Sequence, residues 1–330
     1  MAPRGRPSAR SGKPASGASG RGGARRGSAP AGRSAGGRTG ASGRGGAGGR
    51  NGANGRGGAS GRSGANGRGA DVRPASKKEK SLGGEQVEGR QAVRELLIAG
   101  RRRTREIWIA SDIDPSDVID DIRELANDSR VQVLDVARKR LEQTARSEAP
   151  QGVIAFANAL PEADFDELLK TKNGVKPFLV ALDGVTDPGN LGALLRCCDG
   201  AGVTGVVLPK HRSVHVTPTA AKAAAGAIEH LDIAVVGGLP NAMAAMKKAG
   251  VWTVGLDDDA DRPLFDISSF ATDPVCLVLG AEGKGISRLV RERCDVVVSI
   301  PMEGQLSSLN VSAAGALATY EVLRARQGRI

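Results

Sequence analysis

The sequence lacks the features that define several common protein classes. No apolar run approaches the ~18 residues of a membrane-spanning helix, and the N-terminus has no apolar core of a secretory signal. The four cysteines, Cys197, Cys198, Cys276 and Cys294, form no CxxC pair, and three of them lie in apolar periodic segments. We therefore expect no membrane association, buried free thiols and a reducing compartment, by default the cytoplasm.

Patterns for metal and nucleotide binding are missing as well. The three histidines are scattered and have no acidic cluster beside them, so no metal site is expected. The acidic run at 257–259 is better explained as a turn after a strand. The glycine-rich loop at 280–285 fits neither the P-loop nor the dinucleotide-binding fingerprint, but it could contact a flat ligand such as adenine through its backbone.

Charge is distributed very unevenly along the chain. Residues 1–80 contain 18 Lys and Arg against two acids, a net charge of +16, so the remaining 250 residues carry −5 although the whole chain carries +11. This first segment is Gly, Arg, Ala and Ser with almost nothing apolar larger than Ala. It cannot bury enough surface to offset its ordering entropy, so a disordered basic tail is expected over 1–80.

The tail contains a repeat in which arginine recurs every six residues from Arg38 to Arg68, in Gly-Arg-X-Gly-Ala-X units. A flexible polycation of this kind suits nucleic-acid phosphates without sequence preference. A solubilising tail with no essential role is the alternative. We expect RNA tethering and no part in the chemistry.

A small α/β domain is predicted over 84–158. Apolar spacing predicts helices over 87–99, 118–125 and 138–145, and strands over 105–110, 131–136 and 152–157. Two basic clusters lie at element ends, where side chains can reach phosphates in spite of the acidic body. We expect RNA contacts from both, rather than two solvated faces; their residues are Arg101, Arg102, Arg103, Arg138, Lys139 and Arg140.

A polar, acidic linker is predicted over 159–176, and a second domain over 177–330. In that domain apolar strands alternate with helices, which indicates a parallel sheet covered by helices on both faces. The expected strands are 178–182, 205–208, 231–236, 251–256, 275–279 and 296–300. The expected helices are 191–202, 217–227, 240–249, 286–292 and 310–326.

Three polar loops follow strands of this sheet, where ligands of such folds bind. In the first, Asn190 is a good helix N-cap and Arg196 lies on an otherwise apolar helix, so it needs an anionic partner. The second, 280–285, contributes one carboxylate, Glu282. In the third, Ser308 and Asn310 lie among small hydrogen-bonding residues just before a helix.

Together these loops resemble the three motifs of the SpoU/TrmH (SPOUT) RNA 2′-O-ribose methyltransferases. The matching stretches are Asp-Pro-Gly-Asn-Leu-Gly-Ala-Leu-Leu-Arg from 187, Leu-Gly-Ala-Glu-Gly-Lys-Gly from 279 and Ile-Pro-Met-x6-Leu-Asn-Val-Ser from 300. Order and spacing match too, and the similarity extends over roughly 85–330. The smaller domain is similar to the L30e-like substrate-binding domain of bacterial 23S rRNA guanosine 2′-O-methyltransferases.

The resemblance implies an α/β fold with a C-terminal trefoil knot, S-adenosylmethionine as cofactor, an RNA substrate and a homodimer. It makes Gly280, Ile300 and Leu309 cofactor contacts, mainly through backbone. It assigns active-site roles to Arg196, Asn190, Glu282, Ser308 and Asn310. Arg196 either accepts the proton of the ribose hydroxyl or stabilises the developing alkoxide, and Glu282 is a candidate ion-pair partner for it.

The expected activity is therefore methylation of a ribose 2′-hydroxyl in RNA, with a guanosine of 23S rRNA as the favoured target. The alternatives are the same chemistry on tRNA or at an antibiotic-resistance site in rRNA, and a non-catalytic RNA-binding protein with this fold. Retention of Asn190, Arg196, Glu282 and Asn310 argues against the last, because a pure binder has no need of all four.

Overall fold

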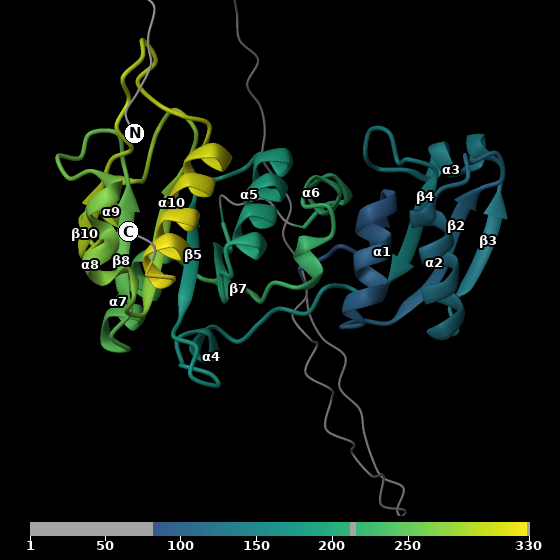
Figure 1. The fold of residues 1–330 in the computed structure, drawn as a ribbon, viewed down its shortest axis with the longest axis horizontal. Coiled ribbons are helices and arrows are strands. Elements are labelled where there is room, and N and C mark those ends of the chain that lie inside the picture. The colour runs from purple at the N-terminus through teal and green to yellow at the C-terminus, as the bar shows by residue number, and fades with distance from the viewer. Residues whose placement is uncertain (1–81, 212–215, 329–330) are drawn as a thin grey trace, which may run out of the picture. The chain divides into compact units, whose positions relative to one another are not determined.

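The computed structural model describes residues 82–211 and 216–328. The predicted basic tail, 1–80, lies outside these residues. The described chain forms two sheets, each with its own helices (Figure 1). We call residues 82–163 the small module and the described residues from 177 to 328 the large module. Within them, no helix is both long and apolar enough to cross a membrane.

The small module is built on a mixed sheet with the order β1-β4-β2-β3. β2 and β3 run parallel, whereas β4 is antiparallel to both of its neighbours. Its elements in chain order are β1 (Gln86–Glu88), α1 (Arg90–Ala99), β2 (Thr104–Ala110), α2 (Asp117–Asp128), β3 (Gln132–Val136), α3 (Arg138–Thr144) and β4 (Val153–Ala157).

Both faces of the small sheet are covered because its strands alternate between two apolar clusters. Ile107 and Ile109 of β2 point to the face that α1 and α2 cover, where Leu96 and Ile122 are fully buried. On the other face Leu141 of α3 packs on Ile154 and its neighbours. This pattern matches the period of two in strands and the 3.6-residue period in helices.

The large module is built on six parallel strands in the order β10-β8-β9-β5-β6-β7. The strands are β5 (Phe178–Asp183), β6 (Gly205–Pro209), β7 (Ile233–Val236), β8 (Trp252–Leu256), β9 (Val275–Gly280) and β10 (Val296–Val298). The helices are α5 (Pro188–Gly200), α6 (Pro218–Ala223), α7 (Leu239–Lys248), α8 (Ser268–Ala271), α9 (Arg288–Arg291) and α10 (Val311–Arg326). Two 3-10 turns, η1 (Ala227–Glu229) and η2 (Leu264–Ile267), complete the module, and α4 (Phe165–Leu168) lies between the modules.

The strands of the large sheet are apolar along their length because helices cover both of its faces. Phe178, Val180 and Leu182 of β5 face a cluster that includes residues of α5, α6, α8 and α10. Leu179 and Ala181 face the opposite cluster, which includes residues of α4, α7 and α9. The expected parallel sheet with helices on both faces is confirmed.

The structure corrects several predicted boundaries. Val87 lies in strand β1 rather than in a helix. The helix begins only after Gly89, because a φ of 99° at that residue is incompatible with a right-handed helix. The segment at 264–271, for which no element was predicted, forms η2 and α8. Asp187, not Asn190, is the N-cap of α5.

All four cysteines are free thiols, but only Cys198 and Cys276 are buried as expected, whereas Cys197 and Cys294 are partly exposed. Burial raises the pKa of the Cys198 and Cys276 thiols far above their usual range, and it raises the pKa of Cys294 to about 12. These thiols therefore stay protonated at neutral pH and are poor nucleophiles.

Gly192 of α5 allows the close approach of α6. A Cβ at this position would lie 2.4 Å from the carbonyl oxygen of Ala220 and 2.5 Å from Cβ of Ala223. We expect Gly192→Ala to lower the free energy of unfolding by about 1–3 kcal/mol, because the backbone of α6 must move. Gly237→Ala is the matched control, since nothing lies within 4 Å of its added Cβ. Equal thermal stability of the two variants would contradict this packing.

Candidate functional site

The three motif loops meet at one edge of the large sheet. β9 lies between β5 and β8, and β8 also pairs with β10, all in parallel. The loops after β5, β9 and β10 therefore leave the sheet on the same side. Asp183, at the end of β5, holds the segment that follows the second loop. Its Oδ2 accepts a hydrogen bond of 2.7 Å from the backbone N–H of Ser287.

The first loop leaves the side chain of Asn190 free for the site. Oδ1 of Asp187 accepts from the backbone N–H of Asn190 at 2.7 Å, and Pro188 occupies the first turn, where its missing N–H costs nothing. The cap is thus made by Asp187. Asn190 lies in the first turn with its amide group available for other contacts.

The third loop orients Asn310 through a helix cap. Its Oδ1 accepts from the backbone N–H of Ser312 at 2.9 Å and from the Ser312 hydroxyl at 2.6 Å. The amide is thereby fixed at the start of α10, and its Nδ2 is directed to the other loops.

Asn190, Glu282 and Asn310 form one hydrogen-bonded cluster, which we call the polar triad. Nδ2 of Asn310 donates to Oδ1 of Asn190 at 2.9 Å and to Oε1 of Glu282 at 3.2 Å. Nδ2 of Asn190 donates to Oε2 of Glu282 at 3.1 Å. One residue from each motif is present, so residues 120 positions apart are brought into contact.

The polar triad holds an exposed carboxylate without a cationic partner among the described residues. Both oxygens of Glu282 accept from amides, and no ion pair joins it to Arg196. The predicted Glu282–Arg196 pair is therefore absent from the described structure. An oriented carboxylate between two amides can accept a hydrogen bond from a ligand hydroxyl or take its proton.

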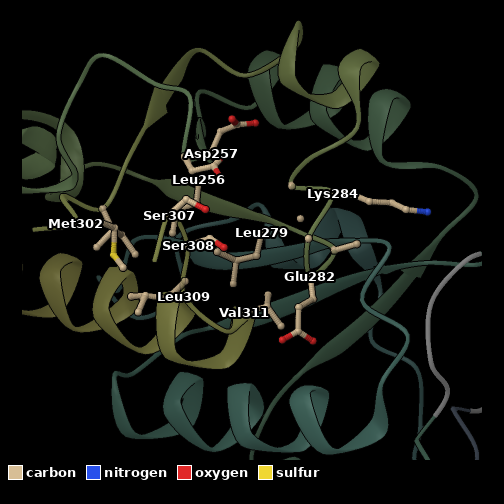
Figure 2. A pocket seen from close by; sticks show the side chains of 17 residues that line it. Leu256, Asp257, Leu279, Glu282, Lys284, Met302, Ser307, Ser308, Leu309 and Val311 are labelled. Atoms are coloured by element: carbon tan, nitrogen blue, oxygen red, sulfur yellow. The ribbon is translucent and has the colours of Figure 1, made fainter. Parts of the chain in front are cut away.

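A cavity of about 420 Å³ opens beside the triad, and Glu282 belongs to both. Figure 2 shows residues 307–309 on one side of it and Glu282 and Lys284 on the other. Its lining includes the apolar side chains of Leu256, Leu279 and Val311 together with residues of the second and third loops. All three predicted cofactor contacts, Gly280, Ile300 and Leu309, line it, as does Ser308.

Gly280 is required by the shape of the second loop. The loop closes on itself through the pairing of Ala281 with Gly285. A Cβ on Gly280 would lie 2.0 Å from the carbonyl carbon of Gly285 and 2.2 Å from the nitrogen of Ile286. Only glycine permits this turn, which forms one wall of the cavity.

Sequence reasoning missed part of the lining. Asp257, Lys284 and Met302 also line the cavity. For Asp257 the sequence predicts only a turn after a strand. Its position just after a predicted strand was the available signal, but the neighbouring position of β8 and β9 in the sheet is not written in the sequence. No group of three or more His, Cys, Asp or Glu in the described residues could hold a metal ion.

Arg196 lies apart from the triad. It is exposed on α5, six residues after Asn190, a distance of about 9 Å along a helix. It lines a separate cavity of about 340 Å³ together with Glu95 of α1 and His230. It forms no hydrogen bond or ion pair with any described residue, so its guanidinium is available to an anion.

The predicted RNA contacts of the small module divide into two groups. The prediction for Arg102 is wrong, because its side chain is only 2% exposed and is paired with Glu229. Arg101 is exposed, but its guanidinium is held by the carbonyl of Leu231 and by Asp232. The others lie at or near the surface: Arg103 and Lys139 are exposed, Arg138 pairs with Asp112, and Arg140 lies 4.7 Å over the Trp108 ring.

Comparison with known proteins identifies the family. Residues 177–320 match the SpoU rRNA methylase family, and residues 86–163 match the RNA 2′-O ribose methyltransferase substrate-binding family. The chain belongs to the SpoU methylase family.

Particular relatives extend over most of the chain. A 23S rRNA (guanosine-2′-O-)-methyltransferase RlmB of Shewanella oneidensis is 41% identical over 243 residues, 72% of this chain and 96% of the relative. RlmB of Pseudomonas aeruginosa is 40% identical over 246 residues, 73% and 97% of the two chains. The crystal structure of AviRb from Streptomyces viridochromogenes with AdoMet matches with a TM-score of 0.61 and 28% identity, covering 73% of this chain and 90% of that one.

Proposed function

We propose that this protein transfers a methyl group from S-adenosylmethionine to the ribose 2′-hydroxyl of a guanosine in 23S rRNA. The observation that carries the proposal is the polar triad, in which one residue of each family motif meets beside a cavity of about 420 Å³ that Glu282 also lines. This chain matches relatives that are named as enzymes of this activity over more than nine-tenths of the length of each relative.

The cavity suits the cofactor in size and character. A volume of about 420 Å³ is in the usual range of small-molecule sites, which are mostly apolar with a few placed polar groups. Leu256, Leu279 and Val311 offer an apolar surface to a base, and the turn at Gly280 brings loop backbone to its edge. Asp257 is placed to accept hydrogen bonds from ligand hydroxyls. When bound, the cofactor supplies an electrophilic methyl group on a positively charged sulfur.

The chain's own residues orient the acceptor and stabilise its charge. The triad carboxylate of Glu282 can hold the ribose hydroxyl and receive its proton, while the amides of Asn190 and Asn310 keep that carboxylate fixed. Guanidinium groups stay protonated in proteins, so we assign Arg196 to a phosphate beside the ribose and to the developing alkoxide rather than to proton removal. Orientation of two substrates supplies much of the rate in such reactions.

We also propose the finer features that the family resemblance implies. β10 pairs at the edge of the sheet, yet α10 packs on α5, where Gly315 meets Leu194. The chain between them returns across the sheet, which supports a trefoil knot. For a homodimer, the support is the exposed apolar surface of Leu306 and Leu317, which are 76% and 49% exposed. The free thiols support a cytoplasmic location.

RNA binding is proposed for an L30e-like domain at 84–158 and for the basic tail. The described surface retains Arg103, Lys139 and Arg140 for phosphate contacts. The proposed linker is 159–176, and the proposed catalytic domain is 177–330.

The target is tested by mapping 2′-O-methyl groups on rRNA and tRNA from a strain that lacks the gene. We expect one guanosine of 23S rRNA to lose its methyl group and to regain it on complementation. Loss of a methyl group from tRNA alone would reject the rRNA assignment, and unchanged maps would reject the activity.

Gly280→Ala should weaken S-adenosylmethionine binding by about tenfold or more, equivalent to ~1.4 kcal/mol, because the added Cβ displaces the loop that walls the cavity. Calorimetry measures the affinity. Gly304→Ala, in the third loop but with open space around its Cβ, is the control. If both variants bind as the wild type does, the cofactor occupies another place.

Arg196→Ala should keep cofactor affinity within about twofold and lower kcat/KM for RNA by about 10²–10³, the usual effect of removing one charge-stabilising donor. Arg288→Ala, which removes an exposed arginine of α9, is the control. Lost cofactor binding, or turnover near that of the control, would show that Arg196 does not act on the acceptor.

Deletion of residues 1–80 should weaken RNA binding and flatten its salt dependence, because the deletion removes 18 cationic side chains that release counterions from RNA. Turnover at saturating RNA should be unchanged. Affinities measured across a salt series decide the point, and an identical slope for both proteins would exclude tethering by the tail.

A further inference from the structure

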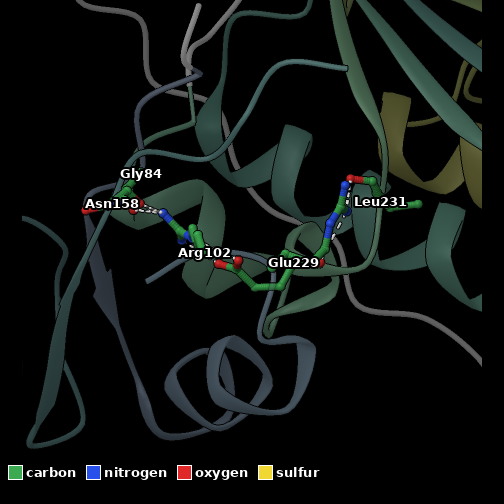
Figure 3. Close-up of polar contacts among 6 residues, drawn as sticks. Gly84, Arg102, Asn158, Glu229 and Leu231 are labelled. Atoms are coloured by element: carbon green, nitrogen blue, oxygen red, sulfur yellow. Dashed lines mark hydrogen bonds and ion pairs between the residues drawn. The ribbon is translucent and has the colours of Figure 1, made fainter. Parts of the chain in front are cut away.

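A buried ion pair joins the small module to the large one. Nε of Arg102 donates to Oε2 of Glu229 at 2.9 Å, and its Nη2 donates to Oε1 at 2.5 Å. The two side chains are 2% and 1% exposed. Arg102 follows α1, whereas Glu229 ends η1, 127 residues later. Figure 3 shows the guanidinium placed between the two modules.

The rest of this guanidinium is also used. Its Nη1 donates to the carbonyls of Gly84 and Asn158, both at 2.7 Å, so the two ends of the small module are tied to the same side chain. Arg101 adds a second tie through the carbonyl of Leu231 at 2.9 Å and Asp232 at 2.5 Å. Buried charges with complete, bidentate partners tolerate little change of geometry. The contact therefore favours one orientation of the modules.

This orientation places the small module along α5, the helix of the first motif. Near its middle, Arg196 shares the 340 Å³ cavity with Gln91 and Glu95 of α1. At its start, Pro188 shares a cleft of about 650 Å³ with Arg146 and Gln86 of the small module. RNA held by the small module would thus lie next to both the triad and Arg196.

We propose that Arg102 and Glu229 are positioning residues for methyl transfer: they hold the small module along α5 so that bound RNA presents its ribose to the site. The inference rests on the proposed function. It also gives Arg102, within the first basic cluster, a role different from phosphate contact. The docking has a kinetic consequence. If the small module is docked in only a fraction of the molecules, RNA binds productively only to that fraction.

The test uses the full chain with Glu229→Ala and the isosteric Glu229→Gln, which keeps the shape if the alanine variant does not fold. The matched control is Asp121→Ala, which removes an ion pair with Arg94 inside the small module. Hydrogen exchange should quicken at 226–232 and 100–104 in the Glu229 variants and stay unchanged in β5 and β9.

Kinetics with a 23S rRNA fragment give the second readout. If about one-tenth of the molecules remain docked, kcat/KM falls about tenfold, mainly through KM, while S-adenosylmethionine affinity stays within about twofold. Glu229→Gln should fall between the wild type and Glu229→Ala. Faster exchange with kcat/KM equal to that of the control would overturn the positioning role, and unchanged exchange would overturn the docking. A wild-type protein without activity on rRNA would instead reject the proposed function, while the exchange data would still decide the docking.

Discussion

The parallel pairing of β10, β8, β9 and β5 is the constraint on which the site depends. Parallel neighbours end at the same edge of a sheet, so loops that are distant in sequence leave side by side. The polar triad then joins them, with Glu282 accepting from Asn190 and Asn310. Each amide is itself fixed by a local feature, the cap of α5 by Asp187 or the cap of α10 by Asn310. The sheet topology brings the three loops together, and the helix caps orient the side chains of Asn190 and Asn310 within the site.

The same helix connects the site to the small module. α5 begins beside the triad, carries Arg196 in its middle and packs against α6 through Gly192. Beyond α6, η1 supplies Glu229, to which Arg102 of the small module is bound. A contiguous set of packed elements therefore runs from the small module to the polar triad. A run of arginines in a sequence usually marks a solvated surface. Here Arg102 of the run is buried and connects the two modules.

How much could be foreseen depended on the range of the interaction. Strand alternation predicted β5 and β9 because Phe178 to Leu182 and Val275 to Leu279 carry their own apolar pattern. β1 was not predicted because its three residues are too few to show a strand pattern. Nothing in the sequence around Gly89 indicates that a strand ends there and a helix begins. Arg102 was misjudged because its partner lies 127 residues away. The triad residues were named from family motifs, but their hydrogen bonds depend on strand order, which local sequence does not encode.

The most direct measurement is a crystal structure of the protein with S-adenosylmethionine or a non-reactive analogue. We predict that the ligand occupies the 420 Å³ cavity, with its base over Leu279 and Val311 and its methyl-bearing centre toward Glu282. The hydrogen bonds among Asn190, Glu282 and Asn310 should persist. A ligand bound in the cleft beside Arg146, or a triad taken apart by binding, would contradict it.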